Sequence, residues 1–174
     1  VEVQYPGDVV NEDLMREGGA RLPDPWRDRA RVTAHWLAVP GSDGRAWCCG
    51  LRKDDGIIYL VQITADGWMS YLVPPRARKP RPMGARLMSD GYARAYGDDL
   101  FRQAGPLVRP DAPWRQQPAS IPQREAAKRH GIAVDGYSKG DYADAFTLDR
   151  SRKWWRKHGM AACRRALGLG EGEE

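Results

Sequence analysis

The stretch "RAWCCGLRKDDGIIYLVQITADGWMSYLV", from Arg45 to Val73, decides the fold. Its runs of β-branched and aromatic residues are separated by Asp-Asp-Gly and Ala-Asp-Gly. Runs of about six to nine β-prone residues divided by such turns are typical of antiparallel hairpins. A further run, "RVTAHWLAV", precedes them and ends at Pro-Gly-Ser-Asp-Gly. We therefore predict a four-stranded antiparallel meander, with strands over Arg31–Val39, Arg45–Lys53, Ile57–Thr64 and Trp68–Val73.

The stretch from Met83 to Gly105, "MGARLMSDGYARAYGDDLFRQAG", has helical spacing. Apolar side chains recur at intervals that place them on one helical face. They are Leu87, Tyr92, Ala95, Leu100 and Phe101. Gly91 and Gly97 weaken the helix, because glycine has a low helix propensity. We predict a helix that covers the sheet, and therefore an α+β fold.

Two proline-rich segments divide the chain. "PPRARKPRP", from Pro74 to Pro82, predicts an extended, polyproline-like connector. "PLVRPDAP", from Pro106 to Pro113, predicts a module boundary. The expected organisation is an extended arm over 1–31, a sheet with its helix over 32–105, a linker over 106–118, a basic helical unit over 119–168 and an acidic tail over 169–174.

The composition excludes several classes of protein. The length of 174 residues suits one domain with a helical appendage, and 29% of the residues are charged. The sequence has no run of 18 apolar residues, so it predicts no membrane-spanning helix. Three cysteines are too few for a disulfide framework, which indicates a cytoplasmic protein. The chain begins at Val1 instead of Met, so we expect a fragment or a processed product.

Positive charge is concentrated in the last third of the chain. The segment 115–166 holds 12 Lys and Arg against 5 Asp and Glu, whereas 1–114 is nearly balanced. Such asymmetry predicts an anionic partner, although a solvated helix surface has the same composition.

The basic segment contains start and stop signals for two short helices. Ser120 is suited to cap a helix over Ile121–His130, which would end at Gly131. Ser138 is suited to cap a second helix, with Asp141 completing a capping box. The expected small core consists of Ala126, Ala127, Ile132, Tyr142 and Phe146.

The segments "WRQQPAS", "AAKRHGI" and "GYSKGDYADAF" resemble the C-terminal accessory region of bacterial and phage DEAD/DEAH-type (superfamily 2) helicases. The unit is also similar to SAP-like helix–extended loop–helix DNA-binding units. The matching positions are Trp114, Arg115, Pro118, Ala119, Ser120, Gln123, Gly131, Ile132, Ser138, Lys139, Gly140 and Asp144. The first helix of the pattern is usually rich in Leu, whereas this one has Ala126, Ala127 and Lys128. The resemblance covers about 35 residues and implies DNA binding beside a helicase motor. This sequence has neither a Gly-x-x-x-x-Gly-Lys-Ser/Thr loop nor an Asp-Glu box, so it predicts no ATPase motor.

A last helix is expected over Thr147–Gly168, capped by Thr147 or Asp149 and split or kinked at Gly159. Its basic residues are suited to contact phosphates, and a tryptophan to stack on an unpaired base. Trp154 and Trp155 are adjacent, so they point about 100° apart on a helix and at least one is expected in the core.

The function that these patterns favour is non-catalytic DNA binding, mainly through the phosphate backbone. The candidate binding residues are Lys128, Arg129, Lys139, Arg152, Lys153, Trp154, Trp155, Arg156, Lys157, Arg76, Arg78, Lys79 and Arg81. For the four cations of the first proline-rich segment, the alternative is a stiff linker whose charge keeps it solvated. We expect no cofactor and no metal, because the three histidines and three cysteines lack the spacing of paired ligands.

Two alternatives remain open from the sequence. The first is a protein-interaction module that uses an aromatic sheet face, formed by Trp36, Trp47, Tyr59, Trp68 and Tyr71. The second is a metal-dependent nuclease whose site is assembled from Asp54, Asp55, Asp98 or Asp99. Turn chemistry explains those aspartates more simply.

Overall fold

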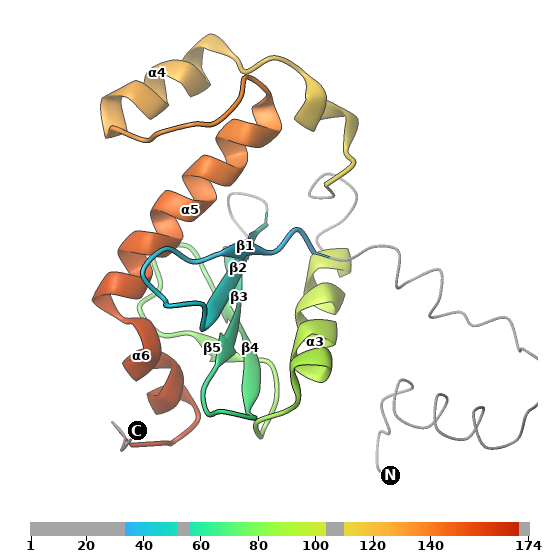
Figure 1. The fold of residues 1–174 in the computed structure, drawn as a ribbon, viewed down its shortest axis with the longest axis vertical. Helices are drawn as coiled ribbons and strands as arrows, with labels where there is room; N and C mark the ends of the chain where they lie inside the picture. Colours follow the sequence, from blue (N-terminus) through green and yellow to red (C-terminus); the bar gives the residue numbers. More distant parts are fainter. Residues whose placement is uncertain (1–33, 52–55, 104–109, 171–174) are drawn as a thin grey trace, which may run out of the picture. The chain divides into compact units, whose positions relative to one another are not determined.

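Antiparallel strands in sequential order, β1-β2-β3-β4-β5, form one sheet (Figure 1). The computed structural model describes residues 34–51, 56–103 and 110–170. Within them the strands are β1 Leu37–Ala38, β2 Ala46–Gly50, β3 Ile57–Gln62, β4 Trp68–Val73 and β5 Arg81–Pro82. The predicted meander is confirmed, although its first strand is shorter than expected. The predicted arm over 1–31 and residues 171–174 of the tail lie outside the described residues.

The fifth strand comes from the segment predicted to be a polyproline-like connector. Arg81 and Pro82 pair with Leu72 and Tyr71 of β4. Arg81 and Pro82 are extended, as expected for this segment. Its first residues are not extended, because Pro74–Ala77 form a turn in which Arg76 has φ +61°. Proline cannot donate to the ladder, which is tolerable because β5 is the edge of the sheet.

The sheet lies between two helical layers (Figure 1). Helix α3, Asp90–Gln103, packs on β3 and β4. On the other face lie α5, Lys139–Lys157, and α6, Gly159–Ala166. Alternate residues of β3, among them Tyr59 and Val61, share a buried core with Cys163 of α6. Leu60 pairs with Ser70, whose hydroxyl donates to the Ala93 carbonyl of α3. The α+β class is therefore confirmed.

The buried face of α3 agrees with the predicted one at Phe101 and differs from it elsewhere. Its buried residues are Ala93, Gly97 and Phe101, whereas Tyr92 is 42% exposed. A Cβ atom on Gly97 would lie 2.6 Å from the Trp36 ring. Phe101 was predicted correctly. Ala93 and Gly97 were missed because the helix backbone lies close to the sheet there, so small residues make the contact. The predicted start at Met83 was also too early.

The helix caps of the basic segment agree with the sequence, but its division into helices does not. Helix α4, Ile121–His130, begins at a Ser120 capping box and ends at Gly131, with φ +62°. Ser138 caps α5 with Asp141. The predicted new helix at Thr147 is wrong, because α5 continues through this buried residue. A break at Gly159 is confirmed, with φ +43°.

The basic helices belong to the same domain as the sheet. The described residues from Ala34 onward form one compact unit, which also contains the short 3-10 helix η2, Pro113–Gln116. Tyr71 of β4 donates from its hydroxyl to the Cys163 carbonyl of α6 at 2.9 Å. The second proline-rich segment is thus followed by helices that complete the core. In the described part of the chain, no helix has both the length and the apolar character to cross a bilayer.

Two glycines of α3 provide a matched test of this packing. Gly97→Ala should destabilise the protein by about 1–2 kcal/mol despite the better helix propensity of alanine, because the new methyl group collides with Trp36. Gly91→Ala on the same helix has open space around its Cβ, so it should be neutral or stabilise by up to about 1 kcal/mol. Urea unfolding of the wild type and both variants measures the change in the free energy of unfolding. Equal effects of the two substitutions would contradict the close approach at Gly97.

Candidate nucleic-acid interface

A groove of about 840 Å³ lies between the turn that follows β4 and the C-terminal half of α5. We call it the basic groove. Its cationic side chains are Arg76, Arg78, Arg150, Lys153 and Lys157. Ile57, Tyr59, Val73, Trp154 and the prolines of the turn also line it. Each charged side chain among the described lining residues is basic, so these residues give the groove a positive potential.

Helical spacing explains how α5 forms its wall of the groove. Arg150, Lys153 and Lys157 are three and four residues apart, so they share one side of the helix. Arg150 was not among the predicted binding residues, although its spacing from Lys153 and Lys157 was visible in the sequence. The Lys153 ammonium group also lies 2.6 Å from Asp149 Oδ2.

A tight turn forms the opposite wall. The Ala77 N–H donates to the Pro74 carbonyl at 3.0 Å, and Pro75 occupies the second position. Arg76, at the third position, has φ +61°. A turn with proline second and a positive φ third ordinarily takes glycine there, and a left-handed conformation costs a residue with a Cβ about 1–2 kcal/mol. Strained residues of this kind are concentrated at functional sites.

The two predicted stacking tryptophans are packed against the core. Trp154 and Trp155 are partly buried residues at the edge of the core cluster. The Trp154 ring lies 5.0 Å from Tyr59 and 5.7 Å from His158 between centroids. Its Nε1–H donates to the Ala77 carbonyl at 3.3 Å, which joins α5 to the turn. The expectation that at least one of them packs on the core is confirmed. Trp154 contacts both walls of the groove, because it belongs to α5 and its indole binds the turn.

The positive field of the groove acts on His158. Burial lowers the pKa of this imidazole, and the nearby Lys157 and Arg78 lower it further. His158 is therefore mainly neutral at pH 7, and the charge of the groove comes from Arg and Lys.

The other predicted cations lie outside the basic groove. Lys128 and Arg129 are exposed in the last turn of α4, and Lys139 donates to Gln117 Oε1 at 2.6 Å. Arg152 lies 3.0 Å from Asp149 and lines a different hollow, where Asp135, Asp141, Asp144 and Asp149 also lie. Arg156 is exposed on α5, Arg81 is exposed on β5, and Lys79 lines a hollow beside the groove.

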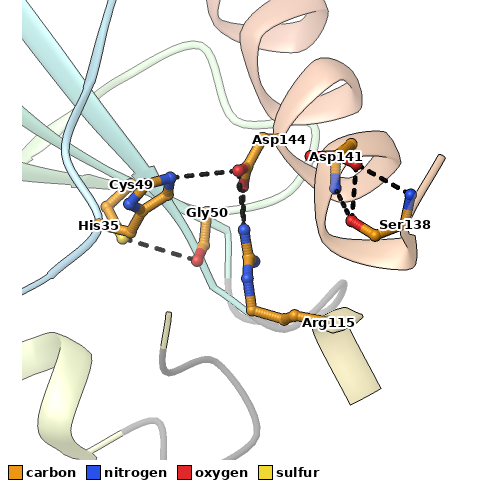
Figure 2. Close-up of polar contacts among 7 residues, drawn as sticks. All are labelled: His35, Cys49, Gly50, Arg115, Ser138, Asp141 and Asp144. Carbon is orange, nitrogen blue, oxygen red and sulfur yellow. Dashed lines mark hydrogen bonds and ion pairs between the residues drawn. The ribbon is translucent and has the colours of Figure 1, made fainter. Parts of the chain in front are cut away.

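A polar cluster connects three segments beside the groove (Figure 2). Asp144 of α5 accepts from Arg115 of η2 at 2.7 and 2.8 Å, and it lies 3.1 Å from His35 Nε2. Burial alone would raise the pKa of Asp144, but the hydrogen bonds from His35 and Arg115 outweigh it and hold the pKa below its usual range. The cluster lines a hollow of about 490 Å³ that shares Arg150 with the basic groove.

The cysteine next to this cluster is not an activated nucleophile. Cys49 donates from its thiol to the Gly50 carbonyl at 3.8 Å (Figure 2). Burial raises its pKa to about 12, and it raises the pKa of Cys48 to about 11 and of Cys163 to about 12. All three free thiols stay protonated at neutral pH, whereas thiol catalysis requires a thiolate.

The structure describes part of each alternative site from the sequence. Of the five predicted aromatics, Tyr59 and Tyr71 are buried and Trp36 packs on Gly97, whereas Trp47 and Trp68 are partly buried. Asp98 accepts from the Ala34 N–H at 2.8 Å and from Trp36 Nε1–H at 3.3 Å.

The acidic residues of the alternative nuclease site either make contacts within the protein or lie outside the described residues. Asp99 pairs with Arg102 on the same helix. The described residues contain no group of three potential metal ligands, and Asp54 and Asp55 lie outside the described residues.

Comparison of the chain with protein-family models, curated proteins and solved structures finds no match in any of the three. The fold and the groove together define an α+β protein with a built cationic surface, and the function has to be inferred from that surface.

The cluster around Asp144 gives a pH-dependent prediction. Asp144→Asn should destabilise the protein by about 1.5–3 kcal/mol at pH 7, because Arg115, whose side chain is only 12% exposed, loses a charged partner. The folded-state pKa of Asp144 lies below the ordinary value of about 3.9, so its stabilisation is complete above that pH and is lost as the pH falls through the folded value. Thermal unfolding of the wild type and the variant from pH 7 to pH 2.5 measures the difference in their stability. This difference should become smaller only below about pH 4.

Asp90→Asn is the matched control. Asp90 and its partner Arg94 are an exposed pair on α3, so this substitution should cost less than about 1 kcal/mol. A comparable loss in both variants would show that Asp144 contributes no more than a surface ion pair.

Proposed function

We propose that this protein is a non-catalytic nucleic-acid-binding module that serves a DNA-processing enzyme such as a helicase. The basic groove would bind the phosphate backbone. One observation carries the proposal: two separate segments bring five Arg and Lys side chains to one groove, and the described residues that line it include no carboxylate.

Phosphate is the anion that this arrangement fits best. Guanidinium groups form paired hydrogen bonds with phosphate oxygens, and lysine adds point charges. Neutralising phosphates releases bound counterions, so affinity should fall steeply with salt and depend little on sequence.

The helicase context rests on the resemblance of residues 114–146. Such a module would hold the nucleic acid while a motor supplied elsewhere moves it. The free thiols Cys48, Cys49 and Cys163 agree with a reducing compartment such as the cytoplasm.

Two double variants with the same loss of charge test the groove. Arg78→Ala/Lys157→Ala removes a cation from each wall, and it should weaken binding of labelled DNA at least about tenfold at 0.1 M salt. The slope of log affinity against log salt should become shallower by about 1.4–1.8, because two phosphate contacts are lost. Lys128→Ala/Arg129→Ala on α4 removes two exposed cations outside the groove and should have a much smaller effect.

Equal losses in the two double variants would indicate diffuse attraction instead of a groove. No binding by the wild-type protein at low salt would refute the proposal.

A substitution of Arg76 should affect DNA binding and protein stability in different ways. Arg76→Gly should leave the free energy of unfolding unchanged or raise it by up to about 1 kcal/mol, because glycine adopts the positive φ without strain. The same substitution should weaken DNA binding several-fold, because it removes a groove cation. Chemical denaturation and a binding titration of the same preparation measure both quantities. A destabilised Gly variant, or one with unchanged affinity, would show that Arg76 is retained for the turn and not for a ligand.

A further inference from the structure

Three hollows meet along one side of α5 and α6. The basic groove shares Arg150 with the hollow beside Trp114, which measures about 490 Å³. It shares Arg78 and His158 with a hollow of about 500 Å³ beside α6. Because neighbouring hollows have cationic lining residues in common, they lie next to one another along the two helices, and together we call them the α5 trough.

The α5 trough is long enough for an extended chain. Its lining residues on α5 run from Ala143 to Lys157, a distance of about 21 Å at about 1.5 Å per residue. It continues along α6 as far as Arg165 and Ala166. A compact ligand such as a mononucleotide would occupy only one of the three hollows.

Charge is sorted between the two sides of α5. Eight Arg and Lys side chains line the trough, and its one carboxylate among the described lining residues is Asp144, which Arg115 and His35 already bind. The hollow on the other side of the helix shares Asp144 with the trough and adds Asp135, Asp141 and Asp149, with Arg152 as its one cation among the described lining residues. A polyanion would therefore be attracted along one side of α5 and repelled from the other.

The trough also offers apolar surface between its cations. Ile57, Val73 and the turn prolines line its middle part, and Trp114 and Phe146 line one end. Trp114 is partly exposed, and the Arg115 guanidinium lies 5.5 Å from its ring centroid. Proteins that bind single strands combine a positively charged groove along the backbone with aromatic contacts to unpaired bases. A duplex keeps its bases stacked inside and could use only the cations.

From this geometry we infer that the α5 trough binds a single-stranded nucleic acid, extended along α5, with a base against Trp114. The inference rests on the proposed function and adds to it the strandedness and the path of the ligand. DNA and RNA single strands share the chemistry that the trough recognises.

The test compares four labelled ligands at one salt concentration: a 15-nucleotide oligo-dT, a 15-nucleotide oligo-rU, and a DNA and an RNA duplex of the same length. We expect at least one single strand to bind about tenfold or more tightly than both duplexes, and its chemistry then identifies the natural ligand. Equal binding, or a preference for a duplex, would overturn the inference but leave the proposed function standing. No binding to any of the four would refute both.

Variants then locate the path. Trp114→Ala should weaken single-strand binding about fivefold or more with little effect on duplex binding. Tyr137→Ala is the control, because Tyr137 is 89% exposed but does not line the trough. A larger loss from Tyr137→Ala would place the strand across the tip of the helical unit and overturn the proposed path.

A second pair of variants serves if Trp114→Ala does not fold. Arg150→Ala and Arg156→Ala each remove one exposed cation from α5, but only Arg150 lines the trough, where two hollows meet. Arg150→Ala should weaken single-strand binding several-fold and make its salt dependence shallower, whereas Arg156→Ala should change neither. Equal effects of the two substitutions would overturn the inferred path.

Discussion

The close packing of α5 on β2 is the contact on which the rest of the structure depends. A Cβ atom on Gly50 would lie only 2.5 Å from Thr147 Oγ1, so the helix can approach the sheet this closely only because residue 50 is glycine. That contact places the second half of α5 beside the turn after β4, which creates the basic groove. It also brings Asp144 within reach of His35 and Arg115, which come from distant parts of the sequence.

Local patterns predicted the parts of the fold that local chemistry controls. The Asp-Gly turns defined the strands, and Ser120 and Ser138 marked helix starts because their hydroxyls satisfy backbone N–H groups. The same reasoning failed at Thr147 and Asp149, which have the side chains of capping residues but lie inside a continuous helix. Tertiary packing of α5 on the sheet outweighs the local signal there.

The candidate site was predictable in its chemistry but not in its geometry. The cations of the proline-rich segment and of α5 were recognisable from the sequence. Nothing in the sequence showed that Arg78 and Lys157, 79 positions apart, line one groove. Nor could composition distinguish Lys153, which faces that groove, from Arg152, which lies among aspartates on the other side of the helix. A one-residue step along a helix turns a side chain by about 100°, so charge counts alone cannot assign a face.

The Trp154 indole has a consequence for how such a groove could change during evolution. Because its N–H holds the turn at Ala77 while its ring packs on Tyr59, this side chain helps to fix the spacing of the two walls. The cations are exposed and make few contacts with the core, so their number can vary without altering that spacing. The positive charge of the groove therefore depends on its exposed cations, whereas the spacing of its two walls depends on Trp154. A substitution at position 154 would therefore change the spacing of the two walls while leaving the cations of the groove in place.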